Sequence, residues 1–89
     1  MKPVIFDRHF EKSYAKRILR DTKLSKQFDE RYALFVEGVR DNPLCDHALT
    51  GSMKGKRSFS VGGDIRVIYL EAPEAYLFLD IGTHNQVYS

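Results

Sequence analysis

Apolar side chains recur at helical spacing in the first part of the chain. Phe10, Tyr14 and Ile18 follow one another at four-residue intervals. Positions three or four residues apart lie on the same face of an α-helix, so this spacing predicts a helix over residues 9–20. The charged residues between them would form its solvent-exposed face.

A second segment carries the same pattern more strongly. Its apolar positions are Phe28, Tyr32, Phe35, Val36 and Val39. Ser25 is suited to cap the start of this helix, and Asn42 with Pro43 marks its end. Because only residues 21–24 separate the two segments, we expect an antiparallel pair of helices.

After Pro43 the period changes from helical to alternating. Residues 57–61 and 64–70 alternate as strands do, and the glycines at 62 and 63 between them predict a tight hairpin loop. A second turn at residues 71–74 leads into a strand over 75–81. Alternation places Asp64 and Arg66 on the same face of the middle strand. Both faces of that strand mix polar and apolar residues, so the pattern leaves open which face the helices cover.

Residues 4–6 add a short strand at the start, and residues 49–54 offer a further one. The predicted fold class is therefore α+β, with two N-terminal antiparallel helices packed on a small antiparallel β-sheet of four to five strands. With 89 residues, the chain is long enough for one compact domain, residues 1–89, and too short for two.

Composition narrows the range of partners and compartments. Fourteen Lys and Arg residues against twelve Asp and Glu residues leave a net charge of only +2, which falls short of a strongly basic nucleic-acid module. Lys54, Lys56 and Arg57 form the one local basic group, which predicts a small RNA-binding patch or simply a solvated turn. No apolar run is long enough to span a bilayer. Cys45 is the single cysteine, which excludes an internal disulfide; we expect it to be a small buried filler in a cytoplasmic protein.

The candidate catalytic groups are gathered near strand ends in the second half of the chain. They are His47, Asp64, Arg66, His84 and Tyr88. Histidines titrate near neutral pH, a carboxylate can orient an imidazole, and a guanidinium binds phosphate. If folding brings these groups together, they suit RNA cleavage without a metal or other cofactor. One group deprotonates the ribose 2′-hydroxyl, Arg66 stabilises the phosphoryl charge, and another group protonates the leaving 5′-oxygen.

Two other readings of these residues remain open. His47, His84 and Asp64 have the composition of a two-histidine, one-carboxylate metal site, although no pair shows local ligand spacing. Alternatively, the histidines are ordinary surface residues of loops.

Two motifs give the sequence a family resemblance. Residues 46–51 read Asp-His-Ala-Leu-Thr-Gly, and residues 81–88 read Ile-Gly-Thr-His-Asn-Gln-Val-Tyr. Together with residues 54–61 and 64–69, they resemble the RelE/ParE toxin superfamily, and most closely its YafQ-like branch. The resemblance implies a type II toxin–antitoxin system. It further implies a toxin that cuts translated messenger RNA on the ribosome without a metal and that a cognate antitoxin protein silences.

The resemblance also assigns roles to individual residues. His47, Asp64 and His84 fall on the catalytic positions of YafQ-like toxins, and Tyr88 falls on a functional aromatic position. Arg66 matches an arginine of RelE-like members, and Arg57 lies where those members carry a basic residue.

Three positions depart from the family pattern. Ser60 stands in place of a frequent histidine, Ile65 in place of a tryptophan, and Asp80 in place of an arginine that assists at the phosphate. Loss of that cation would weaken stabilisation of the phosphoryl charge unless Arg66 or Arg57 replaces it. A ParE-like toxin that inhibits DNA gyrase and cleaves nothing is therefore the main alternative.

Overall fold

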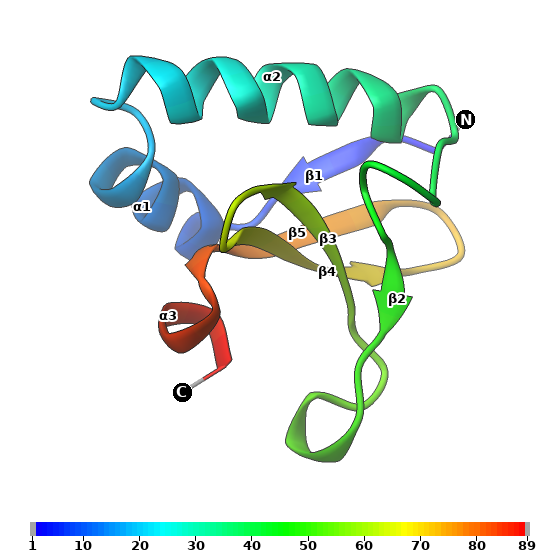
Figure 1. Cartoon of the computed structure of the whole chain (residues 1–89). Coiled ribbons are helices and arrows are strands. Elements are labelled where there is room, and N and C mark those ends of the chain that lie inside the picture. The colour runs from blue at the N-terminus through cyan, green and yellow to red at the C-terminus, as the bar shows by residue number, and fades with distance from the viewer. Residues whose placement is uncertain (1, 89) are drawn as a thin grey trace.

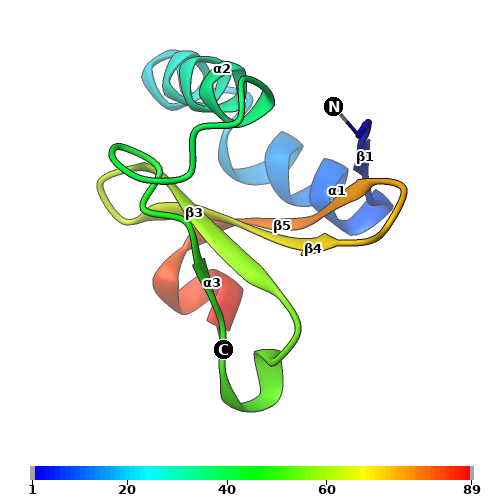
Figure 2. The same ribbon diagram turned by 90° about the vertical axis from the view of Figure 1, so that its right-hand side faces the viewer.

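The computed structural model describes residues 2–88, and it has the predicted α+β architecture (Figure 1). In chain order the elements are β1 (Val4–Phe6), α1 (Arg8–Arg17), α2 (Thr22–Val36), β2 (His47–Ala48), a 3₁₀ turn η1 (Gly51–Met53), β3 (Arg57–Gly62), β4 (Ile65–Glu71), β5 (Tyr76–Thr83) and α3 (His84–Tyr88). The helices α1 and α2 lie on one side of the sheet, and α3 lies on the other (Figures 1 and 2).

The five strands form one mixed sheet in the order β1-β5-β4-β3-β2. Strand β2 pairs antiparallel with β3, β3 with β4, and β4 with β5. Strand β1 instead pairs parallel with β5, with Val4 opposite Tyr76. The expectation of a purely antiparallel sheet was therefore wrong. Parallel pairing requires a long crossover connection, and here both helices and three strands separate the two partners in the chain.

Both N-terminal helices begin at an aspartate. Asp7 accepts a hydrogen bond from the backbone nitrogen of His9, and Asp21 accepts one from that of Leu24. Each carboxylate caps a free backbone N–H and suits the positive end of the helix dipole. The predicted cap at Ser25 was wrong because Asp21 starts the helix one turn earlier; the hydroxyl of Ser25 lies 3.2 Å from that of Tyr14 instead.

The hydrophobic core decides which face of the sheet the helices cover. Phe59, Val67 and Phe78, from three adjacent strands, are fully buried and belong to one cluster with Phe28 and Phe35 of α2. The Phe35 ring stacks on Phe59 at 5.1 Å and meets Phe78 edge-on at 5.3 Å. Such aromatic pairs contribute about 0.5–1.5 kcal/mol each beyond their buried area.

The opposite face therefore carries the alternate residues of the strands. Arg66 and Ile68 of β4 flank Val67, so they point away from α1 and α2. Ile68 is 1% exposed and Val87 of α3 is 7% exposed, which shows that this face is also partly covered.

The hairpin between β3 and β4 is shifted from its predicted position. Gly62 is still in β3, where a bulge follows Ser60, and the turn consists of Gly63 and Asp64. Gly62 and Gly63 have φ values of 137° and 55°, which glycine adopts at little cost. Asp64 thus lies in the turn itself, beside the start of α3.

Candidate active site

One hollow on the α3 side of the sheet collects most of the predicted catalytic residues. It has a volume of about 280 Å³ and is lined by His47, Leu49, Thr50, Met53, Arg66, His84 and Tyr88. These residues come from β2, the β2–β3 connection, β4 and α3, which are far apart in the chain. Folding therefore brings together four of the five predicted groups, and the fifth, Asp64, borders them.

The helix α3 supplies one wall of this hollow and was absent from the predicted elements. Thr83 and Gln86 cap its start reciprocally: the Thr83 backbone nitrogen donates to Gln86 Oε1 at 2.8 Å, and the Gln86 nitrogen donates to Thr83 Oγ1 at 3.3 Å. This is the capping-box arrangement, and the Thr-x-x-Gln spacing in the sequence was the available signal for it.

Gly82 lets α3 fold back closely against the sheet. A Cβ atom at this position would lie 2.6 Å from Gln86 Oε1 and 2.8 Å from Arg17 Nη1. Val87, on the inner side of the helix, is buried. The sheet therefore holds His84 and Tyr88 on a fixed element rather than on a loose tail.

Asp64 links the hairpin turn to the other groups. Its carboxylate accepts a hydrogen bond from the backbone nitrogen of His84 at 3.3 Å and lies 3.7 Å from Nη2 of Arg66. Among the described residues, the Asp64 carboxylate bonds to no imidazole nitrogen. We expected it to orient a histidine ring, but it contacts the backbone of α3 instead. Its position favours a role in holding Arg66 and His84.

His47 is oriented by a hydrogen bond to its own chain. Its Nδ1 lies 3.1 Å from the carbonyl oxygen of Cys45. A carbonyl oxygen only accepts, so Nδ1 carries the hydrogen and the neutral ring has its lone pair on Nε2. The segment before β2 is fixed by Ser60, whose backbone nitrogen donates to the carbonyl of Leu44 at 2.7 Å. Cys45 itself is exposed, so its prediction as a buried filler was wrong.

Arg66 and Tyr88 meet inside the hollow. The guanidinium carbon of Arg66 lies 6.0 Å from the Tyr88 ring centroid, and the His84 ring meets that of Tyr88 edge-on at 4.5 Å. Arg66 Nε and the Tyr88 hydroxyl are buried and have no hydrogen-bond partner among residues 2–88. Buried polar groups are nearly always paired, so these two unpaired atoms are unusual. The Arg66 side chain as a whole is 27% exposed.

The metal-site alternative finds no support in this geometry. Within residues 2–88, no three His, Cys, Asp or Glu side chains lie close enough together to hold a metal ion. His47 and His84 line the same hollow, but Asp64 turns its carboxylate to the α3 backbone.

Comparison with known proteins identifies the family of the chain. The family model described as "Bacterial toxin of type II toxin-antitoxin system, YafQ" matches residues 2–89. The chain belongs to the YafQ toxin family. No protein among the curated sequences matches it.

Solved structures of bacterial toxins have the same fold. YafQ from E. coli strain BL21(DE3) superposes with a TM-score of 0.83 at 21% identity, and all of both chains is covered. The E. coli DinJ–YafQ complex gives 0.81 at 22% identity, again over all of both chains. A copper-bound mutant toxin from Helicobacter pylori gives 0.82 at 23% identity, covering 98% of this chain and 99% of that one.

Asp80, one of the departures from the YafQ pattern, faces α1 rather than the hollow. Its carboxylate lies 3.3 Å from Nη1 of Arg17 and 3.5 Å from Nε2 of His9, and it accepts a hydrogen bond from the backbone of Ile81. The acidic side chain thus joins α1 to β5. Its negative charge is paired by Arg17 outside the hollow, which lessens the expected cost to phosphate binding.

The other two departures lie in different places. Ile65 borders a different depression, between α2 and the hairpin turn, together with Leu24 and Gln27. The backbone carbonyl of Ser60 accepts a hydrogen bond from Arg31 of α2 at 3.0 Å. Ser60 is the register partner of Arg66, so its side chain lies on the face of the sheet that carries the hollow.

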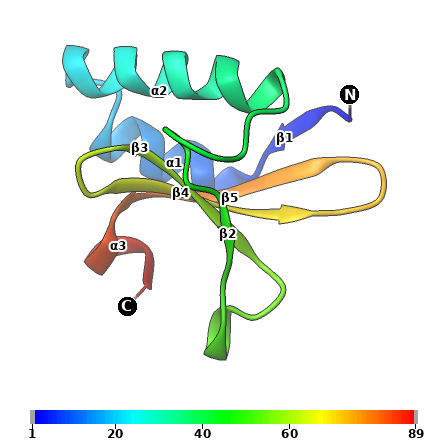
Figure 3. The same cartoon turned by 45° about the vertical axis from the view of Figure 1, so that its right-hand side comes forward.

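The predicted RNA-binding group is split between two places. Lys54 directly follows Met53 in the chain, and Lys56 comes two residues later. Both belong to the connection between β2 and β3, which projects from the sheet (Figure 3). Arg57 instead precedes the core residue Phe59 by two positions, so it belongs to the helix-covered face of β3. Its guanidinium is held by Asp46, as close as 2.7 Å.

Asp46 joins several strands through its buried carboxylate, a structural role that the sequence motif did not predict. Its side chain is fully buried, pairs with Arg57, and accepts a hydrogen bond from the Tyr69 hydroxyl at 2.5 Å. The hydrogen bond to Asp46 raises the pKa of Arg57. Burial, followed by the hydrogen bond to Asp46, raises the pKa of Tyr69. The network anchors the residue directly before His47.

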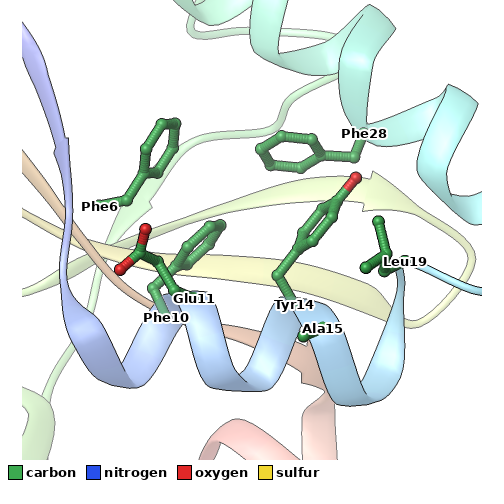
Figure 4. Close-up of a pocket in the computed structure, with 7 residues that line it drawn as sticks. All are labelled: Phe6, Phe10, Glu11, Tyr14, Ala15, Leu19 and Phe28. Carbon is green, nitrogen blue, oxygen red and sulfur yellow. The ribbon is translucent and has the colours of Figure 1, made fainter.

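A second hollow lies on the helical side of the molecule. Its volume is about 380 Å³, and it is lined by Phe6, Phe10, Glu11, Tyr14, Ala15, Leu19 and Phe28 (Figure 4). Tyr14 and Phe28 meet edge-on at 5.2 Å. Leu19 is 58% exposed and Phe6 is 39% exposed, so apolar surface is open to solvent here.

None of the described helices is both long and apolar enough to cross a membrane.

Proposed function

We propose that this YafQ-family toxin is an endoribonuclease that cuts translated messenger RNA at the ribosome. The observation that carries the proposal is the convergence of His47, Arg66, His84 and Tyr88 on one hollow. The space is large enough for part of a nucleotide. The two histidines and the arginine around it suit cleavage of a phosphodiester by attack of the adjacent ribose 2′-hydroxyl.

In the proposed reaction, His47 is the general base. Its Nδ1 is engaged by the Cys45 carbonyl, so Nε2 accepts the proton of the ribose 2′-hydroxyl. The 2′-oxygen attacks the adjacent phosphorus, and the bond from phosphorus to the 5′-oxygen breaks. The products are a 2′,3′-cyclic phosphate and a free 5′-hydroxyl.

His84 and Arg66 act on the leaving group and on the phosphoryl oxygens. Protonated His84 gives its proton to the departing 5′-oxygen, and Arg66 stabilises the charge on the phosphoryl oxygens. The Arg66 side chain lines the hollow and is 27% exposed, so its guanidinium can donate to one of these oxygens. Asp64, near both residues, is a positioning residue. The scheme uses side chains alone and requires no metal or cofactor.

The test is the mapping of RNA ends after induced expression and after incubation with programmed ribosomes. The proposal expects cuts within translated codons that leave 2′,3′-cyclic or 3′-phosphate ends, and cleavage that persists in EDTA while the ribosomes stay intact. Products with 3′-hydroxyl ends would contradict it, because they indicate metal-assisted hydrolysis.

The proposal includes a cognate antitoxin as the protein partner, and the second hollow is a candidate docking surface for it. This hollow adjoins a further depression lined by Lys12, Ala15, Lys16 and Arg20, with Ala15 common to both. In the described chain, these three cations form no salt bridge. An apolar groove with a basic rim suits an amphipathic segment that carries acidic side chains.

This docking is tested by co-expression with the product of a short reading frame adjoining the gene. Leu19→Asp should release the complex, whereas Asp29→Asn, an exposed change on α2, should not. A complex unaffected by Leu19→Asp and by Lys16→Glu would place the antitoxin elsewhere.

A further inference from the structure

The active-site hollow has two unlike walls. One wall consists of His84 and Tyr88 on α3, which the proposed chemistry uses. The other consists of Leu49, Thr50 and Met53 from the connection between β2 and β3, and the proposed chemistry gives them no role. Arg66 lies in β4, and its guanidinium lies near the Tyr88 ring.

The β2–β3 wall is apolar except for one hydroxyl. Leu49 and Met53 are half-buried, while Thr50 between them is exposed. A hollow lined by apolar side chains and a tyrosine ring is suited to a flat, unsaturated group, which can stack on the ring and pack against the apolar side chains. A phosphate would not suit these side chains, and the cations that do suit it, Lys54 and Lys56, follow directly in the loop.

The connection is closed on itself by backbone hydrogen bonds. The Leu49 nitrogen donates to the Lys56 carbonyl at 2.9 Å, and the Lys56 nitrogen donates to the Met53 carbonyl at 3.0 Å. The Met53 nitrogen donates to the Thr50 carbonyl at 3.2 Å. This loop projects from the sheet as a compact turn (Figures 2 and 3). It therefore presents its side chains in a defined arrangement before any ligand binds.

We propose that Leu49, Thr50 and Met53 form a base-reading wall. An unpaired nucleobase of the RNA enters the hollow between Met53 and the Tyr88 ring, and the Thr50 hydroxyl bonds to the edge of the base. Met53, unbranched and adaptable, covers any base, so Thr50 is the specificity-determining residue. This inference rests on the proposed ribonuclease function and adds to it the part of the substrate that is recognised.

The first experiment measures base binding without cleavage. The probe is a short RNA that carries the fluorescent base 2-aminopurine and a 2′-deoxyribose at the adjoining position, so that the ribose cannot attack. Stacking should quench the fluorescence with the wild-type protein. Met53→Ala should weaken binding about tenfold, in the range expected for loss of one stacking surface. Ser52→Ala, a neighbour in the same turn that does not line the hollow, should leave binding unchanged.

The second experiment measures selectivity on programmed ribosomes. Thr50→Val keeps the shape of the side chain and removes the hydroxyl. It should redistribute the cuts among codons, because one lost hydrogen bond to a base edge changes discrimination between bases. Thr50→Ser, which retains the hydroxyl, should restore the original distribution.

The outcomes separate this inference from the proposed function. If the wild-type protein cuts RNA, but Thr50→Val leaves the cut sites unchanged and Met53→Ala binds the probe normally, the base-reading wall is wrong and the ribonuclease stands. If the wild-type protein cuts no RNA, the ribonuclease proposal fails, and the 2-aminopurine titration still decides whether a base occupies the hollow. Absence of quenching with the wild-type protein overturns the inference.

Discussion

Nη2 of Arg57 lies 2.7 Å from the carboxylate of Asp46, whose side chain is fully buried. The same carboxylate accepts the Tyr69 hydroxyl, so one acidic group joins β2, β3 and β4 at the edge of the sheet. His47 follows Asp46 directly and belongs to a strand of two residues. So short a strand has few ladder hydrogen bonds, which makes Asp46 the anchor of the proposed general base.

We expect Asp46→Asn to lower the free energy of unfolding by about 2–3 kcal/mol, because Arg57 and Tyr69 lose a charged acceptor in a buried place. Urea denaturation measures this change. RNA cleavage, measured at a low temperature at which the variant is still folded, should also fall because His47 is no longer held in place. Asp29→Asn on α2 is the exposed control and should change neither quantity.

Lys54 and Arg57 should respond differently to replacement by alanine. Lys54 is exposed on the loop beside the hollow, so Lys54→Ala should weaken RNA binding and lower the salt dependence of binding by about one charge. Arg57→Ala should mainly reduce stability, because its guanidinium holds Asp46. Affinity measured at several salt concentrations, with parallel denaturation curves, distinguishes the two effects. An unchanged salt slope for Lys54→Ala would remove it from the RNA-binding surface.

His84→Ala should reduce cleavage on programmed ribosomes by about 10²–10⁴-fold, the usual contribution of a general acid. The fold should persist, because the contacts that dock α3 come from Gln86, Val87 and the backbone of residue 84. Circular dichroism checks the fold. His9→Ala is the matched control, because His9 lies near Asp80 on the α1 side. Full cleavage by His84→Ala would exclude His84 from the mechanism.

The free energy of unfolding should depend on pH in the alkaline range because of Tyr69. Burial and the bond to Asp46 raise the pKa of its phenol above the ordinary value of about 10, so the folded state favours the neutral form. This stabilisation is complete below pH 10 and is lost as the pH rises from 10 toward the folded pKa. Denaturation curves between pH 8 and pH 11 should therefore show falling stability for the wild-type protein. Tyr69→Phe, which lacks the titrating group, should show a flatter profile.

DNA gyrase provides the test of the ParE-like alternative. Because the two histidines and Arg66 share one hollow, we expect a nuclease, and the purified protein should leave gyrase supercoiling unaffected. A supercoiling assay over a range of toxin concentrations measures this. Strong inhibition, retained by His84→Ala, would favour the gyrase inhibitor over the ribonuclease.

Local sequence signals predicted the helices and the hairpin well, and their errors have local causes. The spacing of Phe28, Tyr32 and Phe35 correctly identified α2, but Asp21 rather than Ser25 caps it, since both residues are suitable N-caps and only the backbone decides between them. The glycine pair marked the hairpin, and the bulge after Ser60 then moved the turn to Gly63 and Asp64. The five-residue helix α3 is too short to show a helical period.

The candidate site was harder to predict than the elements. The sequence identified His47, Arg66, His84 and Tyr88 as chemically suitable, and the tertiary structure placed them around one hollow. It placed Asp64 against the α3 backbone and Asp80 against α1, neither of which follows from residue type. Arg57 was predicted to bind RNA because it is basic; burial of Asp46 beside it gives it a structural partner.

The sequence by itself determined the α+β class, the two amphipathic helices and the list of groups able to perform acid–base chemistry. These properties depend on side-chain type and on spacing over a few residues, which act within one element. Only the tertiary structure decided that β1 lies parallel to β5, which face of the sheet the helices cover, and which charged groups face the hollow. Those outcomes depend on the packing of Phe35 and its neighbours between helix and sheet, because core packing joins residues that are distant in the chain and thereby sets the direction of every alternate side chain.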